Sequence, residues 1–380
     1  MKAFIAIDSF KGCLGSAVAC EAARLGLMDA GMSAGDIVCL PLSDGGEGFC
    51  DAVMRYAGGE LVTVGCQGPD GRGLVARYVV SGGTAYIESA SVCGYGQVPD
   101  GKRDPRHTSS FGLGALIRHA ASSGVSRVVV GLGGTCTCDG GAGMLQALGA
   151  KFFDDNVLLA DGTPLLDQRI SSVDFSSMPA LPCRVEAWAD TSASFFGEGG
   201  AVRVFGAQKG IAPADMQAAD DWMCRLFALY ASAAPARRQA CPAGAGAAGG
   251  IGGALAVVLG AGILSGARMM VSLSGLEDKL LSCSDDDVTV ITGEGRYDSQ
   301  TATGKLPFMV ADTARKACPR ASLVCLAGQV AASSEGCFHH VIQVTPQGME
   351  TKKAMDPATA SGNIRHSAYT LIASLLKEGV

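Results

Sequence analysis

Acidic side chains and lysines gather in glycine-rich segments of this 380-residue sequence, and that combination suits phosphate and metal chemistry. Glycine supplies 53 residues, about twice the usual share. It lets a backbone approach a phosphate closely, while lysines offset phosphate charge and carboxylates bind Mg²⁺. Five segments carry the pattern: DSFKG at 8–12, SDGGEG at 43–48, GLGGTCTCDGGAG at 131–143, Asp190 with FGAQKG at 205–210, and TGEGRYDSQTATGK at 292–305.

The first two segments each follow an apolar run that is typical of a buried strand. An open α/β sheet binds ligands at the carboxyl ends of its strands, so Lys11 there could reach a phosphate or a carboxylate. A turn with a solvated lysine is the alternative. Asp44 and Glu47 stand among three glycines, which suits Mg²⁺ coordination directly or through water. An acidic helix start, with Glu47 favoured by the helix dipole, is the alternative there.

The third segment follows an expected strand at 127–130 and runs into a helix-like stretch at 144–148. Backbone N–H groups at such a helix start can cradle phosphates, and Asp139 could hold a metal ion. A purely structural glycine turn is the alternative. The candidate nucleotide-binding residues here are Gly133, Gly134, Thr135, Gly140 and Gly141.

The fourth segment begins with Asp190, at the end of an expected strand over 185–189. An aspartate at that position can take a hydroxyl proton or hold Mg²⁺, and Lys209 can neutralise charge on a transferring group. Taken alone, either residue is more often a surface charge.

The fifth segment also follows an expected strand, and it mixes two acids, a glutamine, a lysine and glycines in fourteen residues. So dense a polar set favours ligand binding over a plain loop. Glu294, Gln300 and Lys305 are candidate nucleotide-binding residues, and Asp298 is a second candidate for contacting a substrate hydroxyl.

The chain ends share an order of elements that predicts a parallel sheet with both faces covered. The last expected helix, from Ser361, places Ile364, Ala368, Leu371, Ile372 and Leu375 on one stripe. The expected strands are 3–8, 36–40, 288–292, 323–327 and 340–344, and the other expected helices are 16–30 and 306–317.

The middle of the chain has a different pattern. Short strands at 61–66, 75–80 and 85–88 are joined by tight turns, which predicts antiparallel pairing, and helices follow at 109–122 and 213–230. We therefore expect an α/β fold with two domains. A Rossmann/flavodoxin-like parallel-sheet domain is formed by both chain ends (1–65 plus 286–380), and a mixed α/β domain (66–285) is inserted between them.

Composition argues against several classes of protein. The net charge is −6 and no Lys/Arg run stands out, so neither nucleic acid nor an anionic membrane is an expected partner. The first eight residues predict a core strand rather than a secretory leader, which indicates a cytoplasmic protein with its 15 cysteines reduced. The uncharged stretch 244–267 contains nine glycines, so we expect a buried, tightly packed element rather than a membrane span.

Familiar nucleotide signatures are missing or lack their context. No Gly-x₄-Gly-Lys-Ser/Thr occurs, so the chain is not a P-loop enzyme. GAGAAG at 244–249 matches Gly-x-Gly-x-x-Gly, but no strand precedes it and the next acid is Glu277, so a dinucleotide site is weakly supported.

Taken together, the glycine-rich segments resemble the type-1 glycerate kinase family. The resemblance covers nearly the whole chain, in the family's order: DSFKG at 8–12, SDGGEG at 43–48, GLGGTCTCDGGAGMLQALGA at 131–150, FGAQKG at 205–210, GAGAAGGIGG at 244–253 and TGEGRYDSQTATGK at 292–305. It implies transfer of the ATP γ-phosphoryl group to D-glycerate with Mg²⁺, giving 2-phosphoglycerate or 3-phosphoglycerate, by a monomer or a homodimer.

Two stretches depart from the family's pattern. The family usually has Asn where Cys138 stands and a small residue at Cys136. After Asp190 it usually reads Asn-Pro-Leu, whereas this chain has Ser192 to Phe196 as SASFF. A thiol cannot replace the donor and acceptor pair of an amide, so these departures bear on substrate preference.

Phosphoryl transfer needs mainly positioning and electrostatic stabilisation. The expected catalytic residues are Asp190, Lys11, Lys209 and Asp298, with Asp190 the first candidate for the glycerate hydroxyl. Lys305 joins the two catalytic lysines in offsetting negative charge. Mg²⁺ is expected at Asp44, Glu47 or Asp139, with Asp190 and Glu294 as further carboxylates. An NAD-dependent dehydrogenase of small hydroxy acids and a non-catalytic sensor of small acids are the alternatives.

Overall fold

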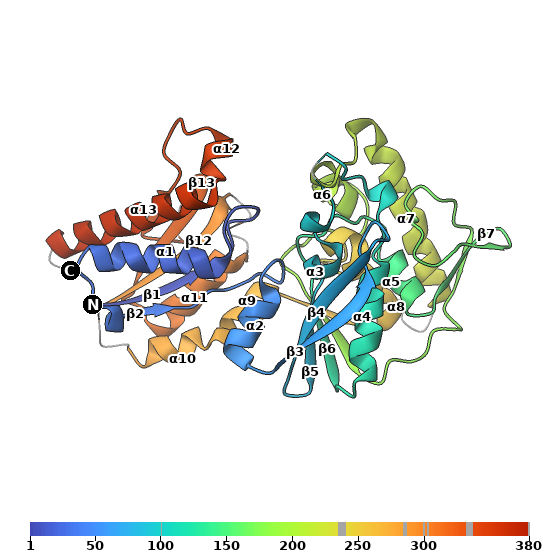
Figure 1. The fold of residues 1–380 in the computed structure, drawn as a ribbon, viewed down its shortest axis with the longest axis horizontal. Helices are drawn as coiled ribbons and strands as arrows, with labels where there is room; N and C mark the ends of the chain where they lie inside the picture. Colours follow the sequence, from blue (N-terminus) through green and yellow to red (C-terminus); the bar gives the residue numbers. More distant parts are fainter. Residues whose placement is uncertain are drawn as a thin grey trace. The chain divides into compact units, whose positions relative to one another are not determined.

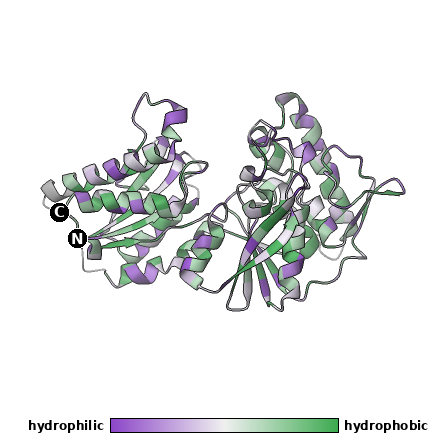
Figure 2. Cartoon of the chain, viewed as in Figure 1, coloured by the Kyte–Doolittle hydropathy of each residue, from purple (hydrophilic) through white to green (hydrophobic). Residues whose placement is uncertain are grey.

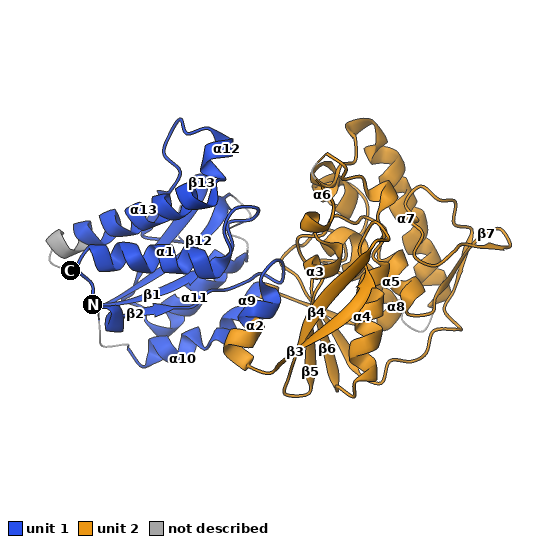
Figure 3. Cartoon of the chain, in the orientation of Figure 1, with its two compact units in different colours: residues 1–52, 267–380 blue, residues 53–266 orange. Residues whose placement is uncertain are grey.

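The chain folds as two compact units, one built from both chain ends (1–52 with 267–380) and one from the middle (53–266) (Figure 3). The computed structural model describes residues 1–99, 101–234, 241–283, 287–298, 301, 304–331 and 337–378. Both units combine helices with a sheet, so the expected two-domain α/β fold class is confirmed. The first join falls within helix α2 (Phe49–Ala57), and both joins come earlier in the chain than the expected limits.

The unit of the chain ends contains a five-stranded sheet in the order β14-β13-β12-β1-β2, paired parallel throughout. Because β1 lies between β12 and β2, the segments that follow these three strands leave the sheet at the same edge. Alternate residues of β1 face opposite sides of the sheet, and both sides are buried. The strands are β1 (Lys2–Ile7), β2 (Ile37–Cys39), β12 (Val288–Tyr297), β13 (Ser322–Val330) and β14 (His340–Gln343).

Helices α1 (Ser16–Asp29) and α13 (Pro357–Glu378) run side by side and share a core with the sheet (Figure 1). Gly26 makes this close approach possible, because a Cβ there would lie 2.2 Å from the carbonyl oxygen of Arg365. The helix α13 begins before the expected Ser361. The remaining helices are η1 (Ala34–Asp36), α9 (Gly266–Ser274), α10 (Leu276–Leu281), α11 (Leu306–Ala317) and α12 (Thr351–Ala354).

The middle unit contains a six-stranded mixed sheet in the order β11-β10-β6-β5-β4-β3. The expected antiparallel pairing of β3, β4 and β5 is confirmed. The structure adds parallel pairing of β6 with β5 and β10, and of β10 with β11. These strands are β3 (Glu60–Gln67), β4 (Gly73–Ser81), β5 (Thr84–Glu88), β6 (Arg127–Gly131), β10 (Arg184–Trp188) and β11 (Gly262–Leu264). A separate antiparallel sheet holds β7 (Lys151–Asp154), β8 (Val157–Leu158) and β9 (Ser172–Asp174).

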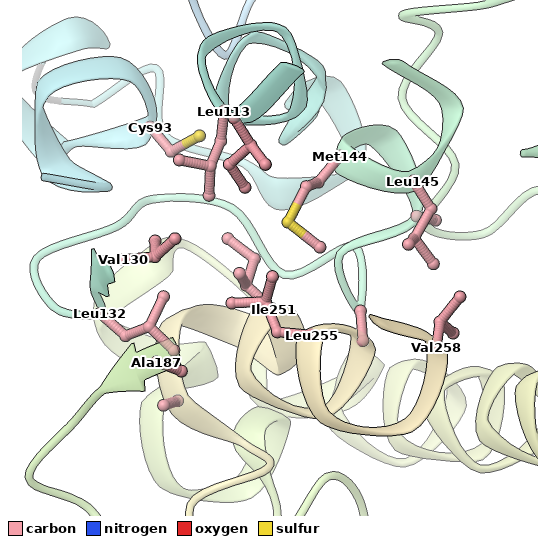
Figure 4. Close-up of a cluster of buried hydrophobic side chains, with 14 of the residues drawn as sticks. Cys93, Leu113, Val130, Leu132, Met144, Leu145, Ala187, Ile251, Leu255 and Val258 are labelled. Atoms are coloured by element: carbon pink, nitrogen blue, oxygen red, sulfur yellow. The ribbon is translucent and has the colours of Figure 1, made fainter. Parts of the chain in front are cut away.

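Apolar side chains from several helices meet in the core of the middle unit, where Leu113, Met144, Ile251 and Leu255 lie close together (Figure 4). Apolar strands lie beside helices of mixed polarity in each unit (Figure 2). The helices are α3 (Ala90–Cys93), α4 (Phe111–Ser122), α5 (Ala142–Ala147), α6 (Ala201–Lys209), α7 (Met216–Ala233) and α8 (Ile251–Leu259). Short 3₁₀ turns are η2 (Tyr95–Gln97), η3 (Pro105–His107), η4 (Pro213–Asp215) and η6 (Ala247–Gly250).

The uncharged stretch 244–267 is a packed element, as expected. It supplies η6, the buried helix α8 and strand β11. Within the described part of the chain, no helix combines the length and apolar character that crossing a membrane requires. All 15 cysteines lie in the described part of the chain, and none of them is joined in a disulfide.

Candidate active site

Lys11 and Asp44 form an ion pair at the carboxyl edge of the parallel sheet. They lie in the loops that follow the neighbouring strands β1 and β2, and Lys11 Nζ is 2.6 Å from Asp44 Oδ2. The backbone N–H of Gly46 donates to the other carboxylate oxygen, at 3.0 Å. Burial opposes ionisation of Asp44, but the charge and hydrogen bond of Lys11, together with the Gly46 N–H and the charge of Lys305, keep the pKa of Asp44 below its ordinary value. The charge of Asp44 in turn raises the pKa of Lys11, so both groups are held in their charged forms.

Asp8 lies at the same edge, directly after β1, and sequence reasoning did not single it out. Its side chain is only 5% exposed, and one oxygen accepts the N–H of Ser9 at 2.7 Å. Burial, followed by the negative charge of Asp44, raises the pKa of Asp8 well above its ordinary value. A buried carboxyl beside another carboxylate is typical of a place prepared for a cation or a proton. The available signal was its position as the first acid after a core strand.

Glu294, Asp298 and Lys305 come together at the end of β12. Thr301 Oγ1 donates to Glu294 Oε1 at 2.6 Å, while Lys305 Nζ lies 3.2 Å from Asp298 Oδ1 and 4.0 Å from Glu294 Oε2. Burial raises the pKa of Glu294, although Thr301 and Lys305 act in the opposite direction. The predicted nucleotide-binding residue Gln300 lies outside the described residues.

Two hydroxyl groups at this edge have no hydrogen-bond partner among the described residues. Ser9 Oγ follows Asp8, and Thr292 Oγ1 lies on β12 two positions before Glu294. Both residues are buried, at 4% and 1% exposure. Because a buried hydroxyl without a partner is costly, these two groups are suited to bond a ligand.

The donor set at this edge fits Mg²⁺ that arrives with phosphate oxygens. Asp8, Asp44 and Glu294 offer carboxylate oxygens, the ligand type that Mg²⁺ prefers. Among the described residues, no group of three or more His, Cys, Asp or Glu side chains is arranged to hold a metal ion. Mg²⁺ is usually bound by one or two carboxylates together with waters and substrate phosphates, so a dedicated cage is not required. Glu47, the other candidate in this loop, is exposed.

In the middle unit, Lys209 is almost completely buried at the end of α6. Its side chain is 3% exposed, and Nζ donates to Thr135 Oγ1 at 3.1 Å and to the carbonyl of Thr137 at 2.7 Å. Burial lowers the pKa of Lys209. The structure therefore joins the third and fourth sequence segments through one ammonium group.

Asp139 lies in the same loop and is bound entirely by the protein's own donors. Its Oδ2 accepts the N–H of Ser110 at 2.8 Å, the hydroxyl of Ser110 at 2.8 Å and the N–H of Gly143 at 3.2 Å. Its Oδ1 accepts the N–H of Gly141 at 3.1 Å. Ser110 is a residue that sequence reasoning missed, since no local pattern connects positions so far apart in the chain.

The candidate glycines of this loop fall into two groups. Gly133 is half-buried, and Gly134 is exposed with a positive φ of 64°. Gly140 and Gly141 are buried, and their N–H groups donate to the carbonyl of Gly249 at 3.0 Å and to Asp139. The first group is therefore open to a ligand, whereas the second shapes the loop from inside. Thr135 is buried, at 2% exposure, and its hydroxyl bonds Lys209.

Asp190 lies two residues beyond the end of β10 and is half-buried. Ser265 Oγ donates to its Oδ1 at 3.0 Å. The carboxylate is thus anchored at the carboxyl end of a strand, as the sequence predicted, and its catalytic role stays a prediction.

A sequence model of the Glycerate kinase family matches residues 3–376. The chain belongs to the glycerate kinase family. It is therefore a kinase, and its family is one of glycerate-phosphorylating enzymes rather than dehydrogenases or sensors. The chain is 38% identical to the glycerate 2-kinase of Escherichia coli K12 over 83% of this chain and 82% of that protein. It is 36% identical to the glycerate kinase of Bacillus subtilis 168 over 90% of this chain and 88% of that protein.

A solved structure gives the same picture for the fold of this glycerate kinase family member. A protein named glycerate kinase 2 from Salmonella typhimurium LT2 matches with a TM-score of 0.76 and 36% identity, over 100% of this chain and 99% of that one. The sequence resemblance to the family is thereby confirmed.

Each of the two departures from the family pattern places one side chain in the core of the middle unit. Cys138 and Phe195 are both 0% exposed and belong to the same core cluster. A Cβ at Gly140 would lie 2.9 Å from the ring of Phe195, and a Cβ at Gly253 would lie 2.2 Å from it. In this glycerate kinase family member, Cys138 and Phe195 therefore belong to the packing beneath the glycine loops.

Proposed function

We propose that this chain transfers the γ-phosphoryl group of ATP to D-glycerate, with Mg²⁺, and that the product is 2-phosphoglycerate. The observation that carries the proposal is the group at the carboxyl edge of the parallel sheet, where three carboxylates, two lysines and two unpartnered buried hydroxyls converge. The 38% identity to a protein named glycerate 2-kinase supports the 2-position as acceptor.

The residues of the parallel-sheet unit would bind the charged groups of the reactants. Asp44 and Glu294, with Asp8 beside them, would hold Mg²⁺, which when bound neutralises charge on the transferring phosphoryl group. Lys11, whose side chain is 63% exposed, is long and flexible enough to reach from Asp44 to a phosphate or carboxylate oxygen nearby. Lys305 would offset further negative charge.

In the middle unit, Gly133, Gly134 and Thr135 would contact the nucleotide phosphates through backbone N–H groups and a hydroxyl. Lys209 would supply positive charge from a site with little water, where an ammonium acts more strongly than in bulk solvent. Asp190 is our first candidate for accepting a hydrogen bond from the glycerate hydroxyl, and Asp298 our second. Glu47 remains a predicted ligand of Mg²⁺ through water.

The test is ADP release from Mg·ATP with D-glycerate, compared with L-glycerate, tartronate and no acceptor. Stimulation by D-glycerate alone, with NMR of the product showing phosphate on the 2-hydroxyl, is the expected result. Stimulation by another acceptor, or phosphate on the 3-hydroxyl, would correct the substrate or the position. Near-normal turnover of Asp190→Ala would remove that residue from the mechanism.

A further inference from the structure

Asp139 has the residue type and the glycine-rich setting of a metal ligand, but its oxygens are already occupied. A carboxylate offers about four lone-pair sites, and Asp139 accepts four hydrogen bonds from three residues at 2.8–3.2 Å. Its side chain is 1% exposed. Oδ2 accepts three of these hydrogen bonds, so a metal ion there would compete with donors that are themselves buried.

These hydrogen bonds tie together the starts of two helices. Ser110 immediately precedes α4, and Gly141 and Gly143 lie at the start of α5. The Ser110 hydroxyl completes the arrangement, because it donates to Asp139 and accepts the N–H of Met144 at 2.9 Å. A Cβ at Gly143 would lie 2.2 Å from Ser109 Oγ, so the two helix starts are already in close contact. One carboxylate thus fixes where the glycine loop enters α5.

The same loop carries the groups that hold Lys209. Thr137 stands two residues before Asp139, and its carbonyl accepts the shorter of the two Lys209 hydrogen bonds, at 2.7 Å. One residue before Thr137, the N–H of Cys136 donates to the carbonyl of Cys93 at 2.7 Å. The stretch from Cys136 to Asp139 is therefore fastened at both ends, with the Lys209 acceptor between them. Burial lowers the pKa of Lys209, and the charge of Asp139 partly offsets this effect.

We propose that Asp139 is a positioning residue, which holds the glycine loop so that Thr135 and Thr137 keep the Lys209 ammonium in place, and that it is not a metal ligand. The inference rests on the proposed function. Asn at this position would place an amide NH₂ against backbone N–H donors, so the loop would shift while the fold keeps its other contacts. Lys209 is the group through which that shift reaches the reaction.

A double-mutant cycle tests whether Asp139 acts through Lys209. The variants are Asp139→Asn, Lys209→Met and the combination, each measured for kcat, for Mg²⁺ activation and for ATP affinity by calorimetry. We expect Asp139→Asn to lower kcat roughly 10²-fold, as small misplacements of a reacting group do. The double variant should be no slower than Lys209→Met alone, since the two changes remove one coupled arrangement. The Mg²⁺ midpoint should match wild type.

Several results would overturn the proposal. Additive losses would mean that Asp139 acts independently of Lys209, and unchanged kcat with a lower melting temperature would mean a merely structural role. A Mg²⁺ midpoint raised roughly tenfold or more would identify a metal ligand instead. If the wild type released no ADP with any acceptor, the proposed function would fail, but the coupling in ATP affinity would still decide the inference.

A second variant covers the case in which Asp139→Asn does not fold. Ser110→Ala removes one donor to Asp139 and the acceptor for the Met144 N–H, so it should lower kcat by a smaller factor than Asp139→Asn. In the Lys209→Met background it should have no further effect on kcat. Ser122→Ala is the matched control, because Ser122 lies at the other end of α4, where its hydroxyl donates to the Arg118 carbonyl. Equal kcat values for Ser110→Ala and Ser122→Ala would contradict the proposal.

Discussion

Replacing Asp8 with Asn should make the parallel-sheet unit more stable near neutral pH while lowering activity. The hydrogen bond from the Ser9 N–H, 2.7 Å long, survives, because an amide oxygen accepts it as a carboxylate oxygen does. What disappears is the need to bury a negative charge at 5% exposure, beside Asp44. The pKa of Asp8 lies well above its ordinary 3.8, and a one-unit difference in pKa corresponds to about 1.4 kcal/mol. The expected gain near neutral pH grows with the size of that difference, and its sign is fixed by the raised pKa.

The sign of the pH dependence follows from the raised pKa. Below pH 3.8 the carboxyl is protonated in the folded and the unfolded chain, so the wild type and the variant should be equally stable there. As pH rises from 3.8 toward the folded-state pKa, the carboxyl loses its proton in the unfolded chain first. The free energy of unfolding of the wild type therefore falls over this range. The stability of Asp8→Asn relative to the wild type should therefore increase over this pH range and stay constant above it.

Hydrogen exchange of peptides from β1 and β12, measured by mass spectrometry, is the suitable assay. Both tryptophans, Trp188 and Trp222, lie in the middle unit, so fluorescence serves as an internal control and should not change. Glu47→Gln is the matched control, because it neutralises an exposed carboxylate in a loop at the same edge. Equal protection in Asp8→Asn and wild type near neutral pH, or a gain that persists below pH 3.8, would refute the reasoning.

Three shorter predictions concern the metal and the packing. Chelation with EDTA should abolish glycerate-dependent ADP release, and excess Mg²⁺ should restore it; persistent activity would contradict the proposed metal. Gly253→Ala should destabilise the middle unit by about 1–3 kcal/mol, seen as a lower fluorescence midpoint, because its Cβ would lie 2.2 Å from Phe195. Gly262→Ala, with open space around it, should not. Iodoacetamide should modify the exposed Cys224 but not Cys138, whose burial raises its pKa to about 11. Mass spectrometry of the peptides checks this, and modification of Cys138 in the folded protein would contradict it.

The sequence alone determined the fold class and most elements, because local signals are strong in this chain. Continuous apolar runs predicted the parallel strands β1, β12 and β13, and short strands joined by tight turns predicted the antiparallel pairing of β3, β4 and β5. Glycine-rich segments with acids and lysines marked the candidate functional loops, because these residue types are rarely combined for packing. The same segments carried the resemblance to the glycerate kinase family.

Only the tertiary structure decided what each polar residue contacts. Asp139 and Ser110 are 29 residues apart, and Lys209 and Thr135 are 74 apart, so no periodicity or spacing could pair them. Asp8 reads as the end of a strand until β2 and β12 bring Asp44 and Glu294 to the same edge. Burial, which raises the pKa of Asp8 and lowers that of Lys209, is a property of the packed chain. The sequence specifies which reactive side chains are present, and the long-range packing of strands and helices decides which of them lie together in one site.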